Sequence, residues 1–462
     1  MFRQFANLAK VHFVGIGGAG MSGIAEVLLD YDLEVSGCDM VASETTDRLA
    51  KLGATVHVGH SEDHLEDVDL VVISSAVSKD NPEVAAAKRR NITIVRRAEM
   101  LGELMRLKYG VAVAGTHGKT TTTSLVGAVL TEAGLDPTVI VGGRLRVSGT
   151  GARLGKSEYL VAEADEYDRS FLRLQPIIGV VTSIDQDHLD TYGDLDAIKK
   201  AFLEFVTKVP FFGQAILCLD DSNIQELLPR LEGRRVLTYG LSPQANLRAI
   251  DTETIAVGSR FTVRNNGEGD LGEVELPMHG AHNVQNALAA IAVGLSLGIG
   301  FQTIAEALQG FSGVHRRFEH RGTWRGALVV DDYAHHPTEV AATLEAARQA
   351  FPHARIVAVF QPHLFSRTRD LAGEFGKALL GANFALVTDI YASREKPIAD
   401  IDSTLVVDAA RRSGHRHVEL CADWRQAREV LVDEVGEGDV VLTLGAGDIY
   451  RLAEDLVAEG AP

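Results

Sequence analysis

The chain has 462 residues, more than one ordinary hydrophobic core accommodates, so two or three domains are expected. Its formal net charge is -18 at pH 7, and it carries no dense block of lysine and arginine, which argues against a nucleic-acid-binding protein. The three cysteines, Cys38, Cys218 and Cys421, are far apart in the sequence and form no C-x-x-C pair. This cysteine usage argues against a disulfide framework or a zinc site and fits a reducing compartment.

The sequence predicts no membrane-spanning segment, because no apolar run approaches the roughly 20 residues that such a helix needs. The N-terminal segment MFRQFANLAKVHFVGIGGAGM places charge before an apolar run, as a signal peptide does. The apolar run is rich in glycine and lacks a small-x-small cleavage site, so we interpret it as a first strand and turn. We therefore expect a cytoplasmic protein that does not bind membranes.

Short runs rich in valine and isoleucine alternate with amphipathic helical stretches, which is typical of a parallel, doubly wound sheet. The runs fall into three series, which predict three α/β domains with boundaries near Leu107 and Gly313. One region, IAVGSRFTVRNNGEGDLGEVELPMHG, alternates instead and contains a glycine-rich turn, which predicts a hairpin inside the middle domain. The first series is KVHFVGIG, LEVSGCD, DLVVISSA and ITIVR; the second is YGVAVAG, YLVAEAD, IIGVVTS and QAILCLD; the third is GALVVDDY, RIVAVFQ, FALVTDIY and DVVLTLGAG.

A first glycine-rich loop follows the first predicted strand. Gly15, Gly17 and Gly20 form a G-x-G-x-x-G pattern that opens a helix, and Asp39 ends the next predicted strand. Glycines at these positions let the backbone approach a diphosphate, and the helix N-terminus donates N–H groups to it. The ligand is then NAD or a nucleotide-sugar, with Asp39 near a ribose; the alternative is a tight structural turn.

A second glycine-rich loop, GTHGKTTTTSL, covers residues 115–125 and also follows a buried strand. Gly118, Lys119 and Thr120 fit the end of the phosphate-binding pattern G-x-x-x-x-G-K-[ST], but Val113 stands where the first glycine belongs. The loop is therefore a shortened variant with Gly115. It retains backbone N–H groups, a lysine for the β- and γ-phosphates and a hydroxyl for Mg²⁺. The alternative is a threonine run that only caps a helix.

Acidic residues follow a third buried run, in YLVAEADEYD. Glu163 ends the run and is the acidic partner that a phosphate loop needs to hold Mg²⁺, unless the segment is only a solvated acidic turn. His188 lies beyond another buried strand, in DQDHLD. Open α/β sheets bind ligands at the carboxyl ends of their strands, which favours a functional role for His188 over a purely structural one.

With these motifs in place, the sequence resembles the Mur ligase family, whose members use ATP to build the peptide of bacterial cell-wall precursors. The resemblance implies three domains: a Rossmann-like N-terminal domain (1–107), a central P-loop ATPase-type α/β domain (108–313) and a Rossmann-like C-terminal domain (314–462). The matching segments, in chain order, are HFVGIGGAGMSGIAEVL, GTHGKTTTTSL, EADEYDRSFL, DQDHLDTYG, GAHNVQNALAA, HRRFE, DDYAHHPTEV, FQPHLFSRTRD and LGAGDIY.

The resemblance also implies a role for each motif. The first loop would bind the diphosphate of a UDP-sugar, the second would bind ATP, and a metal ion, Mg²⁺ or Mn²⁺ in its place, would lie beside the second. The residues implied for the UDP-sugar are Gly18, Ala19, Gly20, Met21, Ser22, Asp39, Ser74 and Ser75. Those implied for ATP are Gly115, Thr116, His117, Gly118, Lys119, Thr120, Thr121, Asn283, Asn286, Arg316 and Asp332. Those implied for the metal are Thr120, Glu163 and His188. Those implied for catalysis are Lys119, Glu163, His188, Arg317 and His335. Those implied for binding the muramyl and amino-acid parts are Tyr333, His363 and Arg367.

Within the family the motifs are most like the branch that joins L-alanine to UDP-N-acetylmuramate. The lactyl carboxylate would attack the γ-phosphate of ATP, and the amine of alanine would then displace phosphate from the acyl phosphate. His188 and His335 are both candidates for the base that takes the amine proton. A monomer or weak homodimer is expected.

Three alternatives remain open. Tyr167 replaces the serine that is usual in the alanine-adding branch and is common in the sister branch that attaches a recycled tripeptide to the same sugar nucleotide. An NAD-dependent dehydrogenase would explain the first loop alone. An inactive nucleotide-sugar sensor would bind the sugar nucleotide without turning over ATP.

Overall fold

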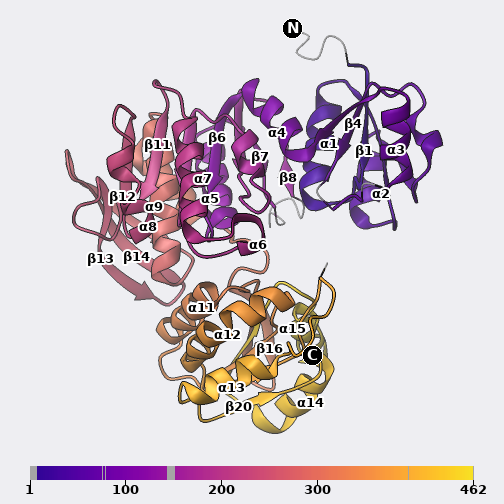
Figure 1. Cartoon of the computed structure of the whole chain (residues 1–462). Coiled ribbons are helices and arrows are strands. Elements are labelled where there is room, and N and C mark those ends of the chain that lie inside the picture. The colour runs from indigo at the N-terminus through magenta and orange to yellow at the C-terminus, as the bar shows by residue number, and fades with distance from the viewer. Residues whose placement is uncertain (1–7, 75, 79, 143–150, 394, 461–462) are drawn as a thin grey trace. The chain divides into compact units, whose positions relative to one another are not determined.

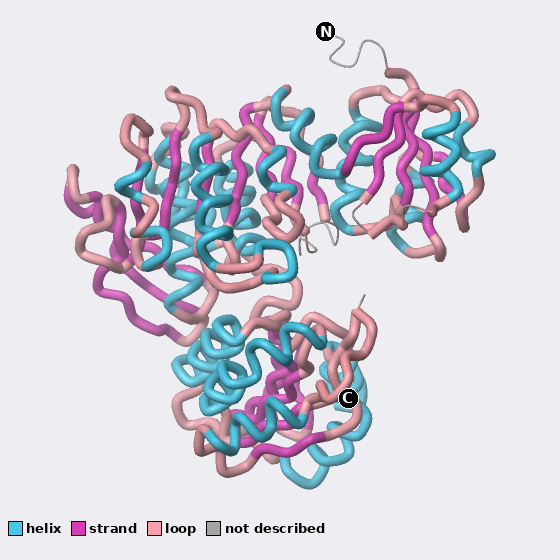
Figure 2. Tube along the Cα trace, viewed as in Figure 1, coloured by secondary structure: helices cyan, strands magenta, loops and turns pink. Residues whose placement is uncertain are grey.

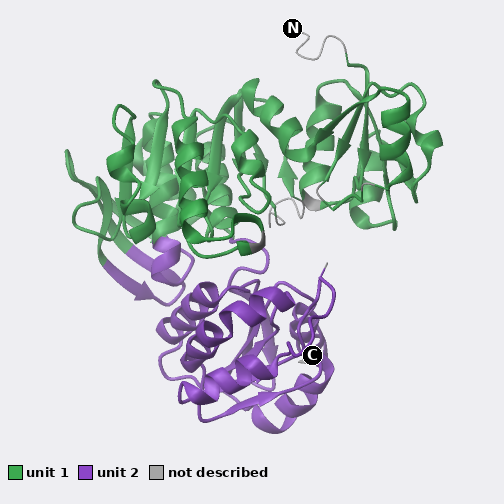
Figure 3. Ribbon diagram, viewed as in Figure 1, with its two compact units in different colours: residues 1–251, 261–275, 285–312 green, residues 252–260, 276–284, 313–462 purple. Residues whose placement is uncertain are grey.

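A computed structural model describes residues 8–74, 76–78, 80–142, 151–393 and 395–460 (Figure 1). The chain divides into two compact units (Figure 3). One unit contains residues 1–251, 261–275 and 285–312, and the other contains residues 252–260, 276–284 and 313–462. In Figure 2 the strands form separate groups with helices packed beside them, as expected for an α/β protein.

The first sheet of the first unit is parallel, with strand order β3-β2-β1-β4-β5. The order reverses between β1 and β4, and ligands of open α/β sheets bind at such a switch point. Its strands are β1 (Lys10–Val14), β2 (Glu34–Asp39), β3 (Thr55–Val58), β4 (Leu70–Ile73) and β5 (Thr93–Arg96), with helices α1 (Ala19–Asp30), α2 (Glu44–Lys51), α3 (Pro82–Arg89) and α4 (Arg97–Arg106) and the 3₁₀ turn η1 (Glu62–Leu65).

The second sheet has strand order β15-β14-β13-β12-β11-β10-β6-β9-β7-β8. Strands β6 and β9–β12 are parallel to their neighbours, and β8 is antiparallel to β7. The strands are β6 (Tyr109–Ala114), β7 (Thr138–Ile140), β8 (Ala152–Arg153), β9 (Tyr159–Glu163), β10 (Ile178–Val181), β11 (Gln214–Cys218), β12 (Val236–Gly240), β13 (Leu247–Ile255), β14 (Gly258–Asn265) and β15 (Gly269–Leu276). The helices are α5 (Lys119–Glu132), α6 (Leu189–Tyr192), α7 (Leu195–Thr207), α8 (Ser222–Gln225), α9 (Ala281–Ser296) and α10 (Phe301–Gln309), with 3₁₀ turns η2 (Ser170–Arg173) and η3 (Leu228–Arg230).

The third sheet belongs to the second unit and has strand order β16-β17-β21-β18-β19-β20, with only the β16–β17 pair antiparallel. Alternate residues of β17, β18, β19 and β21 enter one of two apolar clusters: in β18, Ala358 and Phe360 belong to one and Val357 and Val359 to the other. Both faces of the sheet are therefore covered, as the continuous apolar strands require. The strands are β16 (Glu319–Trp324), β17 (Ala327–Asp332), β18 (Ile356–Phe360), β19 (Phe384–Val387), β20 (Val418–Leu420) and β21 (Val440–Leu444), and the helices are α11 (Pro337–Ala350), α12 (Phe365–Ala378), α13 (Thr404–Arg412), α14 (Trp424–Glu434) and α15 (Tyr450–Gly460), with the 3₁₀ turn η4 (Leu379–Gly381).

The predicted α/β class and its three sheets are confirmed, because every run of the three series forms a strand. The alternating region forms β14 and β15, which are neighbours in the second sheet. The boundaries at Leu107 and Gly313 remain predictions. Within the described part of the chain, no helix combines the length and the apolar character that crossing a bilayer requires.

Candidate active site

The first glycine-rich loop connects β1 to α1 at the switch point of the first sheet. Gly15 has φ +82°, and its N–H donates to the carbonyl oxygen of Cys38 (2.9 Å). The N–H of Gly17 donates to Oδ2 of Asp39 (2.9 Å), and a Cβ at Gly17 would lie 2.9 Å from that oxygen. Asp39 therefore holds the loop in this structure, in addition to its expected place near a ribose.

The start of α1 is arranged to receive an anion. Its N-cap residue, Gly18, makes no side-chain cap, so the cap leaves first-turn N–H groups for another acceptor. The side chains of Met21 and Ser22 are buried, and their N–H groups donate to the carbonyl oxygen of Gly18 (2.9 Å each), so the expected contact of these two residues with a diphosphate remains a prediction. Ala19 lies in the same first turn.

Sequence reasoning missed Arg97, the first residue of α4. A Cβ at Gly20 would lie 2.6 Å from a guanidinium nitrogen of Arg97, so glycine is needed there for this arginine to approach the loop. Ser74 follows β4 at the switch point, whereas Ser75 lies outside the described residues. No motif in the sequence links Arg97 to Gly20, because they come from different helices.

Arg97 also lines a cavity of about 400 Å³ in the first unit. Basic side chains predominate in its lining, which suits an anionic ligand that extends from the first loop. The charged lining residues are Arg96, Arg97, Arg169, Arg173 and Lys208, with Glu99, Asp168 and Glu204 as acids.

The second glycine-rich loop connects β6 to α5. Gly115 has φ +141°, and a Cβ there would lie 1.9 Å from Oγ1 of Thr182. Gly118 has φ +79°, and a Cβ there would lie 2.4 Å from Oδ1 of Asn286. Both glycines are needed for conformation and for close packing, so the shortened loop has a single tight geometry.

Lys119 is half-buried at the start of α5, and its ammonium turns back toward the loop. Nζ donates to the carbonyl oxygens of Gly115 (2.6 Å) and Thr116 (3.0 Å) and lies 2.8 Å from Oε2 of Glu166. Burial alone would lower the pKa of Lys119, but the carboxylates of Glu166, Asp165 and Glu163 outweigh it and raise the pKa. Lys119 is therefore a cation at the loop, and it is the group suited to bind phosphate there.

The expected metal residues lie around this lysine. Oγ1 of Thr120 donates to Oε2 of Glu163 (3.0 Å), so these two lie side by side. Nε2 of His188 is 3.8 Å from Oε1 of Glu166, the partner of Lys119. Burial raises the pKa of Glu166, an effect that the nearby Lys119 partly offsets. The ring of Tyr167 meets the His188 ring edge-on, with 5.0 Å between centroids.

The segment that follows β10 supplies the other wall of the loop. The N–H of Thr116 donates to the carbonyl oxygen of Ser183 (3.0 Å), and Nε2 of His117 lies 3.0 Å from Oδ2 of Asp185. Thr121 is buried within α5. These contacts fix the loop from the segment that leads to His188.

The two asparagines of α9 have different environments. Asn286 is buried, and its Oδ1 accepts a hydrogen bond from Oγ1 of Thr122 (3.1 Å), just behind the loop. Asn283 donates from Nδ2 to the carbonyl oxygen of His279 (2.8 Å). The expected role of the pair in ATP binding remains a prediction.

In the second unit Arg316 and Arg317 are used differently. Arg316 donates to Oδ2 of Asp331 (2.8 Å) and to the carbonyl oxygen of Gly445 (2.6 Å). Arg317 lies over the ring of Tyr333, 5.3 Å from its centroid. Arg316 is thus committed to holding the unit together, and Arg317 is the better candidate for binding phosphate.

The expected residues after β17 and β18 gather at one edge of the third sheet. Asp332 accepts from the N–H groups of Phe318 and Ala334 (2.7 Å each), and burial raises its pKa to about 6. The ring of His335 meets that of His363 edge-on at 5.7 Å, and Nδ1 of His363 lies 3.4 Å from Arg367. The residues expected to bind the muramyl and amino-acid parts are therefore neighbours.

Family models match this chain in three consecutive segments. Residues 10–109 match "Mur ligase family, catalytic domain", residues 113–294 match "Mur ligase middle domain", and residues 316–447 match "Mur ligase, glutamate ligase domain". The chain is 51% identical over 455 residues to a UDP-N-acetylmuramate–L-alanine ligase from Trichlorobacter lovleyi, covering 98% of this chain and 99% of that protein. It is 52% identical over 453 residues to one from Syntrophotalea carbinolica, covering 98% of both.

Two solved structures have the same fold as this chain. A UDP-N-acetylmuramate-alanine ligase from Thermotoga maritima superposes with a TM-score of 0.81 at 32% identity, covering 98% of this chain and 99% of that one. A murein peptide ligase from Psychrobacter arcticus superposes with a TM-score of 0.71 at 24% identity, covering 97% and 98%, and shows the shared fold. The order of the loops, the three sheets and these matches lead to one conclusion: the chain belongs to the Mur ligase family.

Proposed function

We propose that this chain joins L-alanine to the lactyl carboxylate of UDP-N-acetylmuramate, using ATP and passing through an acyl phosphate. The observation that carries the proposal is the identity of about half of all residues, over nearly the full length, with relatives named UDP-N-acetylmuramate–L-alanine ligase. The two glycine-rich loops of the first unit support it, since one chain then has a diphosphate site and a triphosphate site.

A carboxylate does not react with an amine at neutral pH, because its oxygen is a poor leaving group. Transfer of the γ-phosphoryl group to the carboxylate corrects this, but it brings two anions together. Lys119 would offset the repulsion by exchanging the loop carbonyl oxygens that it now contacts for β- and γ-phosphate oxygens. The family resemblance implies that Arg317 would supply a second cation.

The residues beside the second loop fit a hard divalent cation. Thr120 and Glu163 provide two oxygen donors that are already 3.0 Å apart, and His188 is an additional, less usual donor near the same carboxylate cluster. Mg²⁺ held there, or Mn²⁺ in its place, would neutralise phosphate charge. Without the ion, the same carboxylates repel the triphosphate.

The second step needs an unprotonated amine and a site that excludes water from the acyl phosphate. His188 and His335 are the candidate bases, and each already has a carboxylate neighbour: Glu166 for His188 and Glu339 for His335. Tyr333, His363 and Arg367 would position the muramyl and alanine parts. The reaction is expected in the cytoplasm, in a monomer or weak homodimer.

One observation favours a second candidate, the attachment of a tripeptide to the same sugar nucleotide. Tyr167 packs against His188, and a tyrosine in that motif is typical of the peptide-attaching branch. The high identity with the alanine ligases outweighs this single residue.

The test is ATP-dependent phosphate release with UDP-N-acetylmuramate, comparing L-alanine with L-Ala-γ-D-Glu-meso-diaminopimelate as acceptor. Release with alanine alone is the expected result. Release only with the tripeptide would replace the proposal by the second candidate, and no release with either acceptor would contradict both. Omitting UDP-N-acetylmuramate gives the background of ATP hydrolysis.

A further inference from the structure

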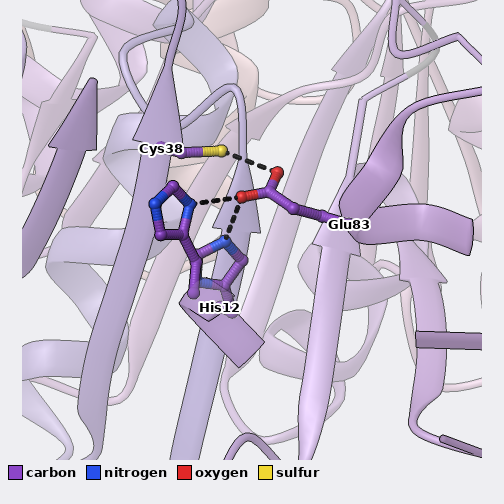
Figure 4. A group of neighbouring side chains, drawn as sticks. His12, Cys38 and Glu83 are labelled. Carbon is purple, nitrogen blue, oxygen red and sulfur yellow. Dashed lines mark hydrogen bonds and ion pairs between the residues drawn. The ribbon is translucent and has the colours of Figure 1, made fainter. Parts of the chain in front are cut away.

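Four side chains that could bind a metal converge where β1 and β2 of the first sheet meet η1 and α3, and none of them is among the residues expected to bind phosphate. They are His12 on β1, Cys38 on β2, His64 in η1 and Glu83 in α3, and each offers one donor atom within 4.8 Å of all the others. Figure 4 shows His12, Cys38 and Glu83 pointing toward one another. We propose that this cluster, which we call the His-Cys-Glu cluster, is a structural site for one Zn²⁺ ion.

The fold explains why these residues meet. His12 pairs with Ser36 and Val14 pairs with Cys38 in the parallel register of β1 and β2, so His12 and Cys38 lie on the same face of the sheet. Glu83 is the second residue of α3, which Asn81 caps by accepting from the Glu83 and Val84 N–H groups. The cap therefore sets the position from which Glu83 reaches the strands.

The donor atoms are close to the spacing that zinc requires. Ligand atoms of a tetrahedral site lie about 3.3–3.7 Å apart, because Zn–N is about 2.0–2.1 Å and Zn–S about 2.3 Å. Oε1 of Glu83 lies 3.5 Å from Nε2 of His12 and 2.6 Å from Nδ1 of His64, and Oε2 lies 2.9 Å from Sγ of Cys38. These three contacts of Glu83 differ by about 1 Å or less from the spacings of a tetrahedral site.

His12 provides an independent indication of a ligand. Its side chain is 0% exposed, and Nε2 makes no hydrogen bond, with the Glu83 oxygen at 3.5 Å as its near neighbour. Its other nitrogen, Nδ1, lies 2.9 Å from Oγ of Ser36. When Nδ1 donates to that hydroxyl, Nε2 presents a lone pair toward a carboxylate, and a cation between the two relieves the repulsion.

Charge balance also suits Zn²⁺. Glu83 is 0% exposed, and among the residues that the structure describes its ion-pair partners are the histidines His12, His60 and His64, with no lysine or arginine. A thiolate, a carboxylate and Zn²⁺ add up to zero charge, so the filled site carries no net buried charge. Binding breaks the S–H bond of Cys38 and releases that proton to solvent, as zinc sites with cysteine do.

Two further histidines support the site from outside. His57 stacks on His64, with 4.1 Å between ring centroids, and orients its ring. Nδ1 of His60 lies 3.1 Å from both Sγ of Cys38 and Oε2 of Glu83, and its side chain is 21% exposed. His60 is thus positioned at the entrance, where it can pass an ion inward.

The site has a structural consequence. Cys38 immediately precedes Asp39, which holds the N–H of Gly17 in the first glycine-rich loop. An ion bound to Cys38 fixes the end of β2 and, through Asp39, the loop. The soft thiolate and imidazole donors favour Zn²⁺ over Mg²⁺, so this site is chemically distinct from the oxygen donors beside Lys119.

The experiment is a Co²⁺ titration of the full chain, after removal of metals and with excess Mg²⁺ to occupy oxygen-donor sites. We expect one equivalent of Co²⁺ to produce a thiolate-to-cobalt charge-transfer band that Zn²⁺ abolishes. The band should disappear in Cys38→Ser and persist in Cys218→Ser, a matched control whose cysteine is also buried but lies in β11.

Each outcome of the Co²⁺ titration either supports or overturns the proposed zinc site. Absence of the band in the unaltered chain overturns the proposal without any variant, so a misfolded Cys38→Ser protein does not leave it undecided. A band that persists in Cys38→Ser also overturns it. As a second measurement, Zn²⁺ should raise the melting temperature of the unaltered chain and not that of His12→Gln, with circular dichroism to verify folding.

Discussion

At the scale of single residues, a substitution of Lys119 tests whether the two glycine-rich loops have separate functions. Its ammonium donates to two carbonyl oxygens of its own loop and to the Glu166 carboxylate. In Lys119→Ala, ATP-dependent ligation should fall at least about 100-fold, the typical loss when one group that stabilises transition-state charge is removed. Binding of UDP-N-acetylmuramate, measured by calorimetry, should stay nearly unchanged.

The exposed lysine Lys200 on α7 provides a control, and Lys200→Ala should retain both activities. Equal loss of ligation and of sugar-nucleotide binding in Lys119→Ala would show that the division of labour between the loops is wrong.

A second residue-scale prediction concerns pH and His282. Burial, together with the charge of Arg317, lowers the pKa of His282 to about 4. A histidine with a depressed pKa stabilises the fold fully above its unfolded pKa of about 6.5, and this contribution declines as pH falls from 6.5 toward 4. His282→Gln should therefore lose less stability than the unaltered chain between pH 7 and pH 5.

The measurement is the denaturant midpoint of tryptophan emission at the two pH values. Exposed His353 supplies the control, since His353→Gln should keep the pH dependence of the unaltered chain. An identical pH response in His282→Gln and the unaltered chain would contradict the assignment. Asp332, whose pKa burial raises to about 6, acts in the opposite direction, so only the difference between variants is informative.

At the scale of elements, the strand–loop–helix unit formed by β6, the second loop and α5 depends on Gly118. This glycine has φ +79°, and a Cβ would lie 2.4 Å from Oδ1 of Asn286. Gly134 ends the same helical region with φ +72°, but a Cβ there meets nothing within 4 Å. Comparing substitutions at Gly118 and Gly134 therefore distinguishes the effect of backbone strain from that of steric overlap.

Gly134→Ala should cost about 1–2 kcal/mol of stability, the strain of a left-handed residue, and retain ATP-dependent phosphate release. Gly118→Ala should also displace Asn286 and lose most of that release. Thermal unfolding and the phosphate assay measure the two effects. Full activity in Gly118→Ala would mean that the loop tolerates a different path.

At the scale of the whole molecule, the two compact units have separate cores. The chain has two tryptophans, Trp324 and Trp424, and both lie in the second unit. Tryptophan emission therefore reports unfolding of that unit, whereas far-ultraviolet circular dichroism reports both. We expect the two transitions in urea not to coincide, as in multi-domain proteins.

UDP-N-acetylmuramate should increase the separation between the two unfolding transitions, because a ligand stabilises the unit that binds it. At 100 times its Kd, the gain is about 2.7 kcal/mol for the first unit. The dichroism transition of that unit should shift to higher urea while the tryptophan transition stays in place. Coincident transitions that shift together would show that the units unfold as one.

The sequence by itself determined those features of the protein that depend on residues close together in the chain. A glycine-rich loop between a buried strand and a helix is contiguous, so Gly15, Gly17, Gly115 and Gly118 could be recognised from spacing alone. The same holds for the apolar runs that became the three sheets. Short strands without a strong apolar pattern, such as β3, β12 and β20, were not predicted, because their stability comes from neighbouring strands.

Only the tertiary structure decided which distant residues meet. The approach of Arg97 to Gly20, the use of Arg316 as a structural arginine and the convergence of His12, Cys38, His64 and Glu83 have no signature in spacing. The sequence argued against a zinc site because its cysteines are isolated along the chain. Side chains on separate strands and helices become neighbours only through strand order and register, and these depend on long-range packing that local sequence does not encode.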